Sequence, residues 1–359
     1  MAIEWLAGNR LRGTTAERPA LGLPSGSVGG WVELGRTTFG GGAKTYEVAS
    51  LANKRYLMVL VNNFQSAQVE GDSLRFNNDT TANQHAGRYN NNGGSDGSIT
   101  NKTKTNMFGF HPHSQPSFAV MNVANLSSKE KLAIIHAVCH SSNVSGAGNP
   151  PDRSEMVAKY INTSNPISSI QQVNVWNNYD SGSEMVVLGY DPDDTHTTNF
   201  WEEIGTATGT GVEDVTASAS KKYNWIQGWV NPTSGSTSMN FQLGNGSLDT
   251  GSNYSWRYSL NGAGDITNNS QSSCILYGNG ANTDIHLFYN IFFINNSANE
   301  KLIMIHNVYY DTAGAGSAPI RFEIVGKWSN TSAQANHAGI VFSAGNAASN
   351  SELKWWGSD

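Results

Sequence analysis

Two pairs of histidines are the first residues whose types and spacing could support chemistry, because imidazole is a common metal ligand. His111 and His113 flank a proline, and His136 and His140 lie in an apolar run. On a strand, which rises about 3.3 Å per residue, side chains four positions apart share a face but stand too far apart to chelate one ion easily. We therefore expect no structural zinc site and no cofactor.

Paired carboxylates are the second candidates, since two of them about 5 to 9 Å apart carry out glycoside hydrolysis. Glu155 and Glu323 each have an arginine two residues before them and a lysine four residues after them. On a strand these side chains share one face, where the cations should keep the carboxylate ionised, the opposite of what a general acid needs. A surface charge ladder or a contact between subunits explains the pattern better. The resulting interface candidates are Arg153, Glu155, Lys159, Arg321, Glu323 and Lys327.

Loop aspartates and nucleophile motifs give little support for an enzyme. Asp79, Asp96, Asp249 and Asp265 lie in segments rich in asparagine and glycine, where Asx turns explain aspartate. A calcium loop stays open as an alternative, although no Asp-x-Asp-x-Asp-Gly run is present. The chain also lacks a Gly-x-Ser-x-Gly elbow, a phosphate-binding loop and a dinucleotide fingerprint. We expect a protein that is not an enzyme and has no catalytic residues.

Aromatic residues are the remaining candidates for binding, because an exposed tryptophan on a β-sandwich can stack on a sugar ring. Tryptophan is concentrated in the second half of the chain. We expect most of these rings to pack in interfaces. The possible glycan-stacking residues are Trp256 and Trp356.

The chain repeats itself, and the repeat organises the elements that carry these residues. Trp31-Val-Glu-Leu-Gly35 recurs as Trp201-Glu-Glu-Ile-Gly205, and His136 recurs as His306 in the same apolar setting. Because such motifs keep their order and return about 170 residues later, we infer two tandem modules related by internal duplication. The predicted units are an extended arm over residues 1–30, a first module over 31–191, a linker over 192–199 and a second module over 200–359.

Within each module the apolar residues alternate over short runs bounded by turn residues, as in half-buried strands. In the run 321–328, Phe322 and Ile324 point inward while their charged neighbours point outward. Turn spacing predicts roughly eight strands per module, arranged as an antiparallel β-sandwich of jelly-roll type, with an immunoglobulin-like topology as the alternative. His136 and His306, at equivalent positions in apolar strands, are interpreted as hydrogen-bonded core histidines.

Composition limits the classes of partner. The chain has 359 residues, a formal net charge of -6 and 14% charged residues, so it offers no basic surface for nucleic acid or anionic membrane. No run approaches the roughly 18 apolar residues of a membrane span, and the first residues do not resemble a secretory leader. Cys139 and Cys274 fall at non-equivalent points of the repeats and are predicted to be separate buried thiols.

Short motifs in both modules resemble structural proteins of tailed bacteriophages. The string Leu74-Arg-Phe-Asn-Asn-Asp-Thr80, followed by Arg88-Tyr89, is similar to the "LRFN-DT-x-NY" repeats of that family, as is its counterpart from Leu248 to Tyr258. The second module replaces the Arg-Phe-Asn portion with Gly-Asn-Gly-Ser from Gly244. The resemblance implies a head decoration protein, a fibre or a tail-associated protein. It also implies a homo-oligomer, with a trimer favoured, and other virion proteins as partners.

We therefore predict a non-enzymatic virion structural protein that is made in the host cytoplasm. In this prediction the arm anchors the subunit on a neighbour, through the candidate contacts Trp5, Arg10 and Arg12. Two alternatives come from other classes. One is a glycan-binding receptor-recognition module, and the other is a polysaccharide-acting enzyme.

Overall fold

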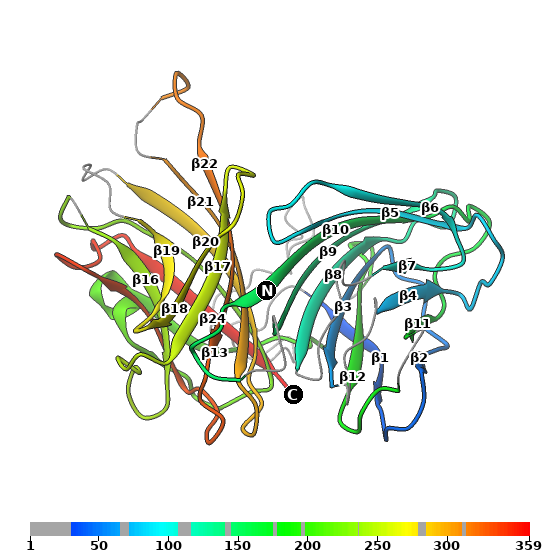
Figure 1. The fold of residues 1–359 in the computed structure, drawn as a ribbon, viewed down its shortest axis with the longest axis horizontal. Helices are drawn as coiled ribbons and strands as arrows, with labels where there is room; N and C mark the ends of the chain where they lie inside the picture. Colours follow the sequence, from blue (N-terminus) through cyan, green and yellow to red (C-terminus); the bar gives the residue numbers. More distant parts are fainter. Residues whose placement is uncertain are drawn as a thin grey trace, which may run out of the picture.

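The computed structural model describes residues 30–64, 72–106, 116–140, 145–174, 178–194, 198–235, 237–278, 285–310 and 314–359. These residues form two β-sandwich modules that lie side by side (Figure 1). Each module pairs an eight-stranded sheet with a four-stranded sheet. The one helical element in these ranges is a 3-10 turn, η2 (Gly209–Glu213), so the predicted all-β class is confirmed. None of the helical structure described here is long and apolar enough to cross a bilayer.

Module 1 contains β1 to β12. Its large sheet has the spatial order β1 (Val32–Thr38), β12 (Glu184–Tyr190), β3 (Tyr56–Asn63), β8 (Ser117–Ala124), β9 (Lys131–His140), β10 (Pro151–Tyr160), β5 (His85–Asn91) and β6 (Gly97–Lys102). Its small sheet has the order β2 (Thr45–Val48), β11 (Ile170–Val173), β4 (Ser73–Phe76) and β7 (Thr105–Asn106).

Module 2 repeats this arrangement with β13 to β24. Its large sheet has the order β13 (Glu202–Thr208), β24 (Glu352–Ser358), β15 (Tyr223–Val230), β20 (His286–Ile294), β21 (Lys301–Tyr310), β22 (Ile320–Trp328), β17 (Tyr254–Leu260) and β18 (Ile266–Gln271). Its small sheet has the order β14 (Val215–Thr216), β23 (His337–Phe342), β16 (Met239–Gly244) and β19 (Cys274–Tyr277). The shared order is what a duplicated module would give, and the duplication itself stays a prediction.

The pairing of strands is that of a jelly roll. In module 1 the antiparallel pairs are nested, because β1 pairs with β12, β2 with β11, β3 with β8 and β4 with β7. Successive pairs alternate between the two sheets, as in one long hairpin rolled into a sandwich. Module 2 nests its strands in the same way. The predicted jelly-roll type is therefore confirmed, and the immunoglobulin-like alternative is not.

The prediction of roughly eight strands per module is wrong. Each module has an eight-stranded and a four-stranded sheet, because two further hairpin-like pairs extend the large sheet beyond β8. The added strands of module 1 are β9, β10, β5 and β6, and β5 and β6 are polar enough to resemble loops in sequence. The predicted arm, with Trp5, Arg10 and Arg12, lies outside the described residues, as do His111 and His113.

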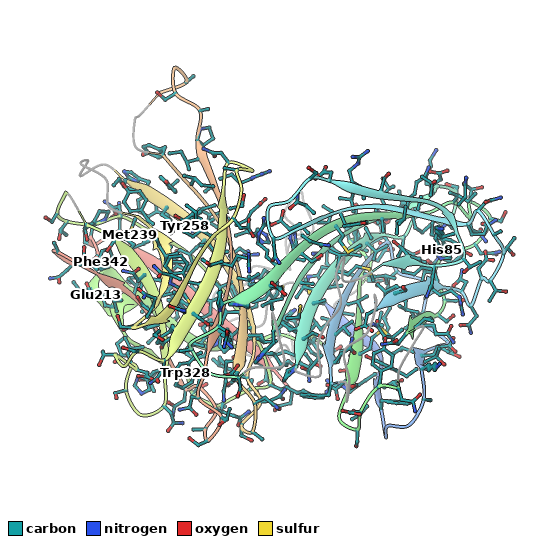
Figure 2. The ribbon with its side chains drawn as sticks, in the orientation of Figure 1. His85, Glu213, Met239, Tyr258, Trp328 and Phe342 are labelled. Carbon is teal, nitrogen blue, oxygen red and sulfur yellow. The ribbon has the colours of Figure 1, made fainter. Side chains whose placement is uncertain are left out.

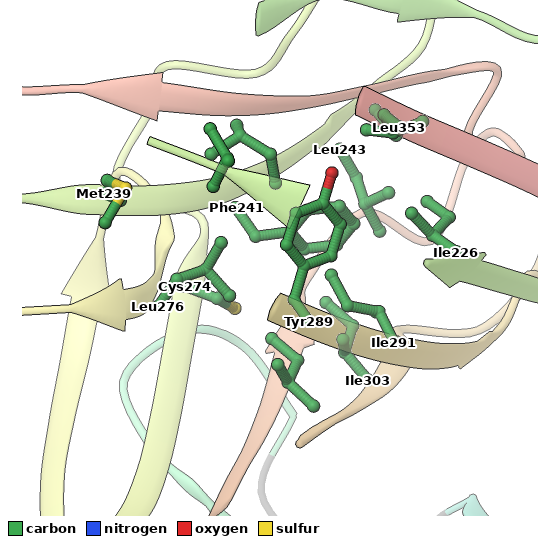
Figure 3. Packing of buried hydrophobic residues seen from close by; sticks show 14 of the residues in the cluster. Ile226, Met239, Phe241, Leu243, Cys274, Leu276, Tyr289, Ile291, Ile303 and Leu353 are labelled. Atoms are coloured by element: carbon green, nitrogen blue, oxygen red, sulfur yellow. The ribbon is translucent and has the colours of Figure 1, made fainter. Parts of the chain in front are cut away.

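Each sandwich has its own apolar core between its two sheets. Figure 3 shows part of the core of module 2, where Phe241 and Leu243 from the small sheet face Ile226, Ile291 and Ile303 from the large sheet. The core of module 1 contains the inward residues of β9 and β10, and Figure 2 shows His85 within that module. Both cysteines are buried and free, as predicted.

A third apolar cluster joins the modules. It is formed by the outer faces of the two large sheets, away from both cores, and its members include Leu60, Phe118 and Val138 from module 1 and Phe292 and Met304 from module 2. Large sheets of a sandwich ordinarily expose one polar face, so apolar residues on both faces indicate that a second protein surface covers the outer one. We call this contact between the modules the junction.

Candidate functional site

The centre of the junction is polar, and strand register explains how its residues meet. Along β9 every second side chain points outward, which places His136 on the face that meets module 2. On the neighbouring strand β10, Glu155 is the cross-strand partner of His136. In module 2, Glu323 on β22 is likewise the partner of His306 on β21. Each module therefore supplies one imidazole and one carboxylate at equivalent positions.

The two histidines face each other across the junction. Their ring centroids lie 4.0 Å apart with an interplanar angle of 57°. The potential ligand atoms of His136, Glu155 and His306 all lie within 4.8 Å of one another. These three residues line a cavity of about 10 Å³ together with Arg153 and Met304. The buried Nδ1 of His136 has no hydrogen-bond partner in the described part of the chain.

Arg153 holds the charges beside this cluster. Its side chain is buried, and its guanidinium donates to both oxygens of Asp265, with Nη2 to Oδ1 at 2.7 Å and Nε to Oδ2 at 3.2 Å. The same guanidinium contacts the carboxylate of Glu155 and lies 3.4 Å from that of Glu323. Burial raises the pKa of Glu155, and the neighbouring Glu323 raises it further, against the opposing effect of Arg153. Three carboxylates, those of Asp265, Glu155 and Glu323, thus share one buried cation.

Burial also keeps the two imidazoles neutral. It lowers the pKa of His136 below its ordinary value, an effect that Glu155 opposes. It lowers the pKa of His306 further, and the adjacent His136 and Arg153 act in the same direction. A neutral imidazole has a free lone pair, which is the form that binds metals and accepts hydrogen bonds.

These contacts correct two predictions. The charged residues of β10 and β22 do not form a surface ladder, because Arg153, Glu155, Glu323 and Lys327 are enclosed or half enclosed at the junction. Neither His136 nor His306 is a core histidine, because their rings meet between the modules, and Nδ1 of His136 has no hydrogen-bond partner among the described residues. Two further interface candidates lie at the periphery, where Lys159 pairs with Glu130 at 3.4 Å and Arg321 pairs with Glu323 at 3.2 Å.

A second polar contact fastens the junction at the end of β9. Glu300 is buried, with its carboxylate 2.8 Å from Nε2 of His140 and 3.2 Å from Nζ of Lys327, and it accepts a hydrogen bond from the amide of Gly146. Burial alone would raise the pKa of Glu300, but His140, Lys327 and the Gly146 amide outweigh it and lower that pKa to about 2. This carboxylate therefore links residues of both modules while it stays ionised.

A third contact lies at the other side of the junction. Glu184 of β12 accepts hydrogen bonds from Tyr223 at 2.7 Å and Lys222 at 2.8 Å, both in module 2, and from Thr38 at 2.6 Å. Burial raises the pKa of Glu184, but the hydrogen bonds from Lys222, Thr38 and Tyr223 lower it overall. Together with the apolar cluster, these ion pairs fix the modules relative to each other.

The tryptophans chosen as possible glycan-stacking residues are mostly covered. Trp256 is 6% exposed and belongs to the core of module 2, where its ring lies 5.4 Å from that of Tyr258. The prediction that Trp256 stacks on a glycan is wrong, because this side chain of β17 points inward between the two sheets. Trp356 packs on Trp225 at 5.2 Å at the edge of the junction and is half-buried.

Two of the four loop aspartates form the expected local turns, whereas Asp265 pairs with Arg153 at the junction and Asp96 lies 3.8 Å from Arg88. Asp79 accepts a hydrogen bond from the amide of Thr81 at 2.9 Å, and Asp249 accepts one from the amide of Gly251 at 2.8 Å. Asp79 also borders an open polar hollow of about 470 Å³ in module 1. The hollow is lined by Asn77, Asn78, Asp79, Thr80, Thr81, Tyr160, Asn162, Asn165 and Ser168.

Comparisons with known proteins add no family. No family model matches the chain, and no curated protein matches it. The solved structures that it matches include human GIVD cytosolic phospholipase A2, at 6% identity and a TM-score of 0.11, over 77% of this chain and 33% of that one. The chain spans about a third of the length of that protein, and a match with this TM-score carries no argument about fold or function.

Proposed function

We propose that this protein is a non-enzymatic structural subunit of a tailed-bacteriophage particle, which assembles through the outer faces of its large sheets. The motif resemblance supports the virion assignment. The observation that carries the assembly role is an exposed apolar row on module 1. Leu132, Ile134 and Val157 are 58%, 54% and 51% exposed, and Ile134 is the cross-strand partner of Val157.

The equivalent positions of module 2 are already an interface. Met304 and Val325, which correspond to Ile134 and Val157 in the repeat, are each 3% exposed and belong to the apolar cluster of the junction. One module thus uses this part of its large sheet for a protein contact, while the other leaves it open. Exposed apolar residues that lie together on a sheet commonly mark a protein contact. We propose that a second copy of the chain covers the row, in a homo-oligomer for which the resemblance favours a trimer.

The mass of the full-length protein in solution tests this proposal. Size-exclusion chromatography with light scattering should show an oligomer that the double substitution Ile134→Thr with Val157→Thr converts to a monomer. Ile266→Thr is the matched control, since Ile266 is 52% exposed on the edge strand β18 and should leave the mass unchanged. A monomeric wild-type chain, or equal masses for all three proteins, would contradict the assembly role.

Glycan binding is the second candidate function, and the polar hollow of module 1 favours it. The amides and hydroxyls that line this hollow can donate to and accept from sugar hydroxyls. Its one aromatic residue, Tyr160, is buried and offers no face for stacking. A glycan-array signal that is lost in Asn78→Ala would support this candidate. Asn268→Ala is the control, because Asn268 is an exposed residue of module 2, and it should keep the signal.

A further inference from the structure

We propose that the junction binds one divalent transition-metal ion, with zinc as the best match, through His136, Glu155 and His306. The ion would be held by two residues of module 1 and one of module 2. It would therefore join the modules, which goes beyond the proposed role of the protein in assembly.

The geometry is close to that of a tetrahedral zinc site. Ligand atoms in such a site lie about 2.0 to 2.2 Å from the ion and hence roughly 3.4 Å from each other. The three candidate atoms lie within 4.8 Å of one another, so side-chain adjustments of about 1 Å would bring them to the ion. The cavity that these residues line, about 10 Å³, has the size of a single atom or water.

One of the residues that line this cavity has an unpartnered nitrogen. Nδ1 of His136 is buried and has no hydrogen-bond partner among the residues that the structure describes. Buried polar atoms are nearly always hydrogen-bonded, and an exception calls for a physical explanation such as an ion. A metal ion would use the lone pair of that nitrogen.

The surrounding charges also favour a cation. Glu155 and Glu323 are in hydrogen-bonding contact. The nearest buried cation, Arg153, is shared among three carboxylates, those of Glu155, Glu323 and Asp265. A divalent ion would offset the repulsion between the carboxylates. Arg153 contacts the carboxylate of Glu155 and would act as a positioning residue for that ligand.

The ligand types select the class of ion. Two imidazoles and one carboxylate suit zinc and its neighbours in the first transition row, whereas calcium and magnesium prefer oxygen ligands alone. Three protein ligands leave a fourth position for water. Glu323 is held by Arg321 at 3.2 Å and is not among the three ligands.

Metal analysis of the untagged full-length chain tests the proposal. After removal of metals with a chelator, titration with zinc chloride should give one ion per chain. His136→Ala and His306→Ala should each weaken binding at least tenfold, the lower limit of what changes around a metal site produce. His286→Asn is the control, because His286 lies on the same sheet of module 2 outside the cluster. Zinc should also raise the melting temperature of the wild type, and less so that of either alanine variant.

X-ray absorption at the zinc edge provides a test that does not depend on the folding of variants. The zinc-loaded wild type should show scattering from two imidazoles and from oxygen ligands. Three outcomes would each overturn the proposal. They are a failure of zinc to bind stoichiometrically, stoichiometric binding without imidazole scattering, and zinc binding that is unchanged in both alanine variants.

Discussion

His136 and His306 occupy equivalent positions in the two modules, and their rings meet at the junction with centroids 4.0 Å apart. The packing around this pair is not symmetric. Module 1 buries Val138, which follows its histidine on β9, whereas module 2 buries Met304, which precedes its histidine on β21. The modules are therefore offset, which leaves Ile134 exposed on module 1 and Val308 exposed on module 2.

Glu300→Gln should destabilise the junction by about 3 to 5 kcal/mol, because it leaves the buried Lys327 without its carboxylate partner. Glu130→Gln is the matched control at the equivalent position of module 1. Glu130 and Lys159 form an exposed pair at 3.4 Å, and such pairs contribute about 1 kcal/mol or less. Urea denaturation at neutral pH measures both free energies of unfolding. Equal losses in the two variants would show that the Glu300 contacts do not fasten the modules.

Acid should weaken the junction through the same carboxylate. The pKa of Glu300 is about 2 in the folded protein, against an ordinary value of 4.5. The unfolded chain therefore takes up a proton as the pH falls through 4.5, while the folded chain resists until about pH 2. The contribution of this carboxylate to the free energy of unfolding is complete above pH 4.5 and is lost between pH 4.5 and pH 2. About 2 kcal/mol of it is lost by pH 3. The difference in unfolding free energy between wild type and Glu300→Gln should shrink accordingly between pH 6 and pH 3, and a constant difference would contradict this assignment.

A second acid-sensitive group lies inside module 1. His85 packs against Phe76 and Tyr160, with ring centroids 5.8 and 4.8 Å away, and its Nε2 accepts a hydrogen bond from the amide of Phe76 at 3.3 Å. Burial lowers the pKa of His85 to about 4, below its ordinary 6.5. The contribution of the neutral His85 ring to the free energy of unfolding is complete above pH 6.5 and is lost as the pH falls toward 4. About 2 kcal/mol of it is lost by pH 5.

Comparison with His85→Gln isolates this contribution. The amide oxygen of glutamine can still accept the hydrogen bond from Phe76, but the side chain does not titrate. The free energy of unfolding should therefore decrease more from pH 7.5 to pH 5 in the wild type than in the variant. Parallel losses in both proteins would place the proton uptake elsewhere.

The interior of each module could be predicted from the sequence, and the junction could not. The alternation in β22 places Phe322 and Ile324 in the core as predicted, because the two faces of a strand follow directly from a period of two. Which outer face packs on the other module depends on the orientation of two folded units, and a local pattern does not contain it. Unbroken apolar runs such as Ile303-Met304-Ile305 and Leu57-Met-Val-Leu-Val61 are the available signal, since they indicate strands covered on both faces.

Trp256→Ala tests whether Trp256 stabilises the core of module 2 or binds a glycan. Because the ring is 6% exposed and packs in the core, its loss should lower the free energy of unfolding by about 3 to 5 kcal/mol, as expected for a large cavity. Trp256→Phe fills part of that cavity and should recover much of the loss. Neither substitution should change a glycan-array signal of the folded protein, because the wild-type ring is not at the surface. A stable Trp256→Ala variant that selectively loses binding to a sugar would show that β17 presents this ring to a ligand, and that outcome would contradict the packing described above.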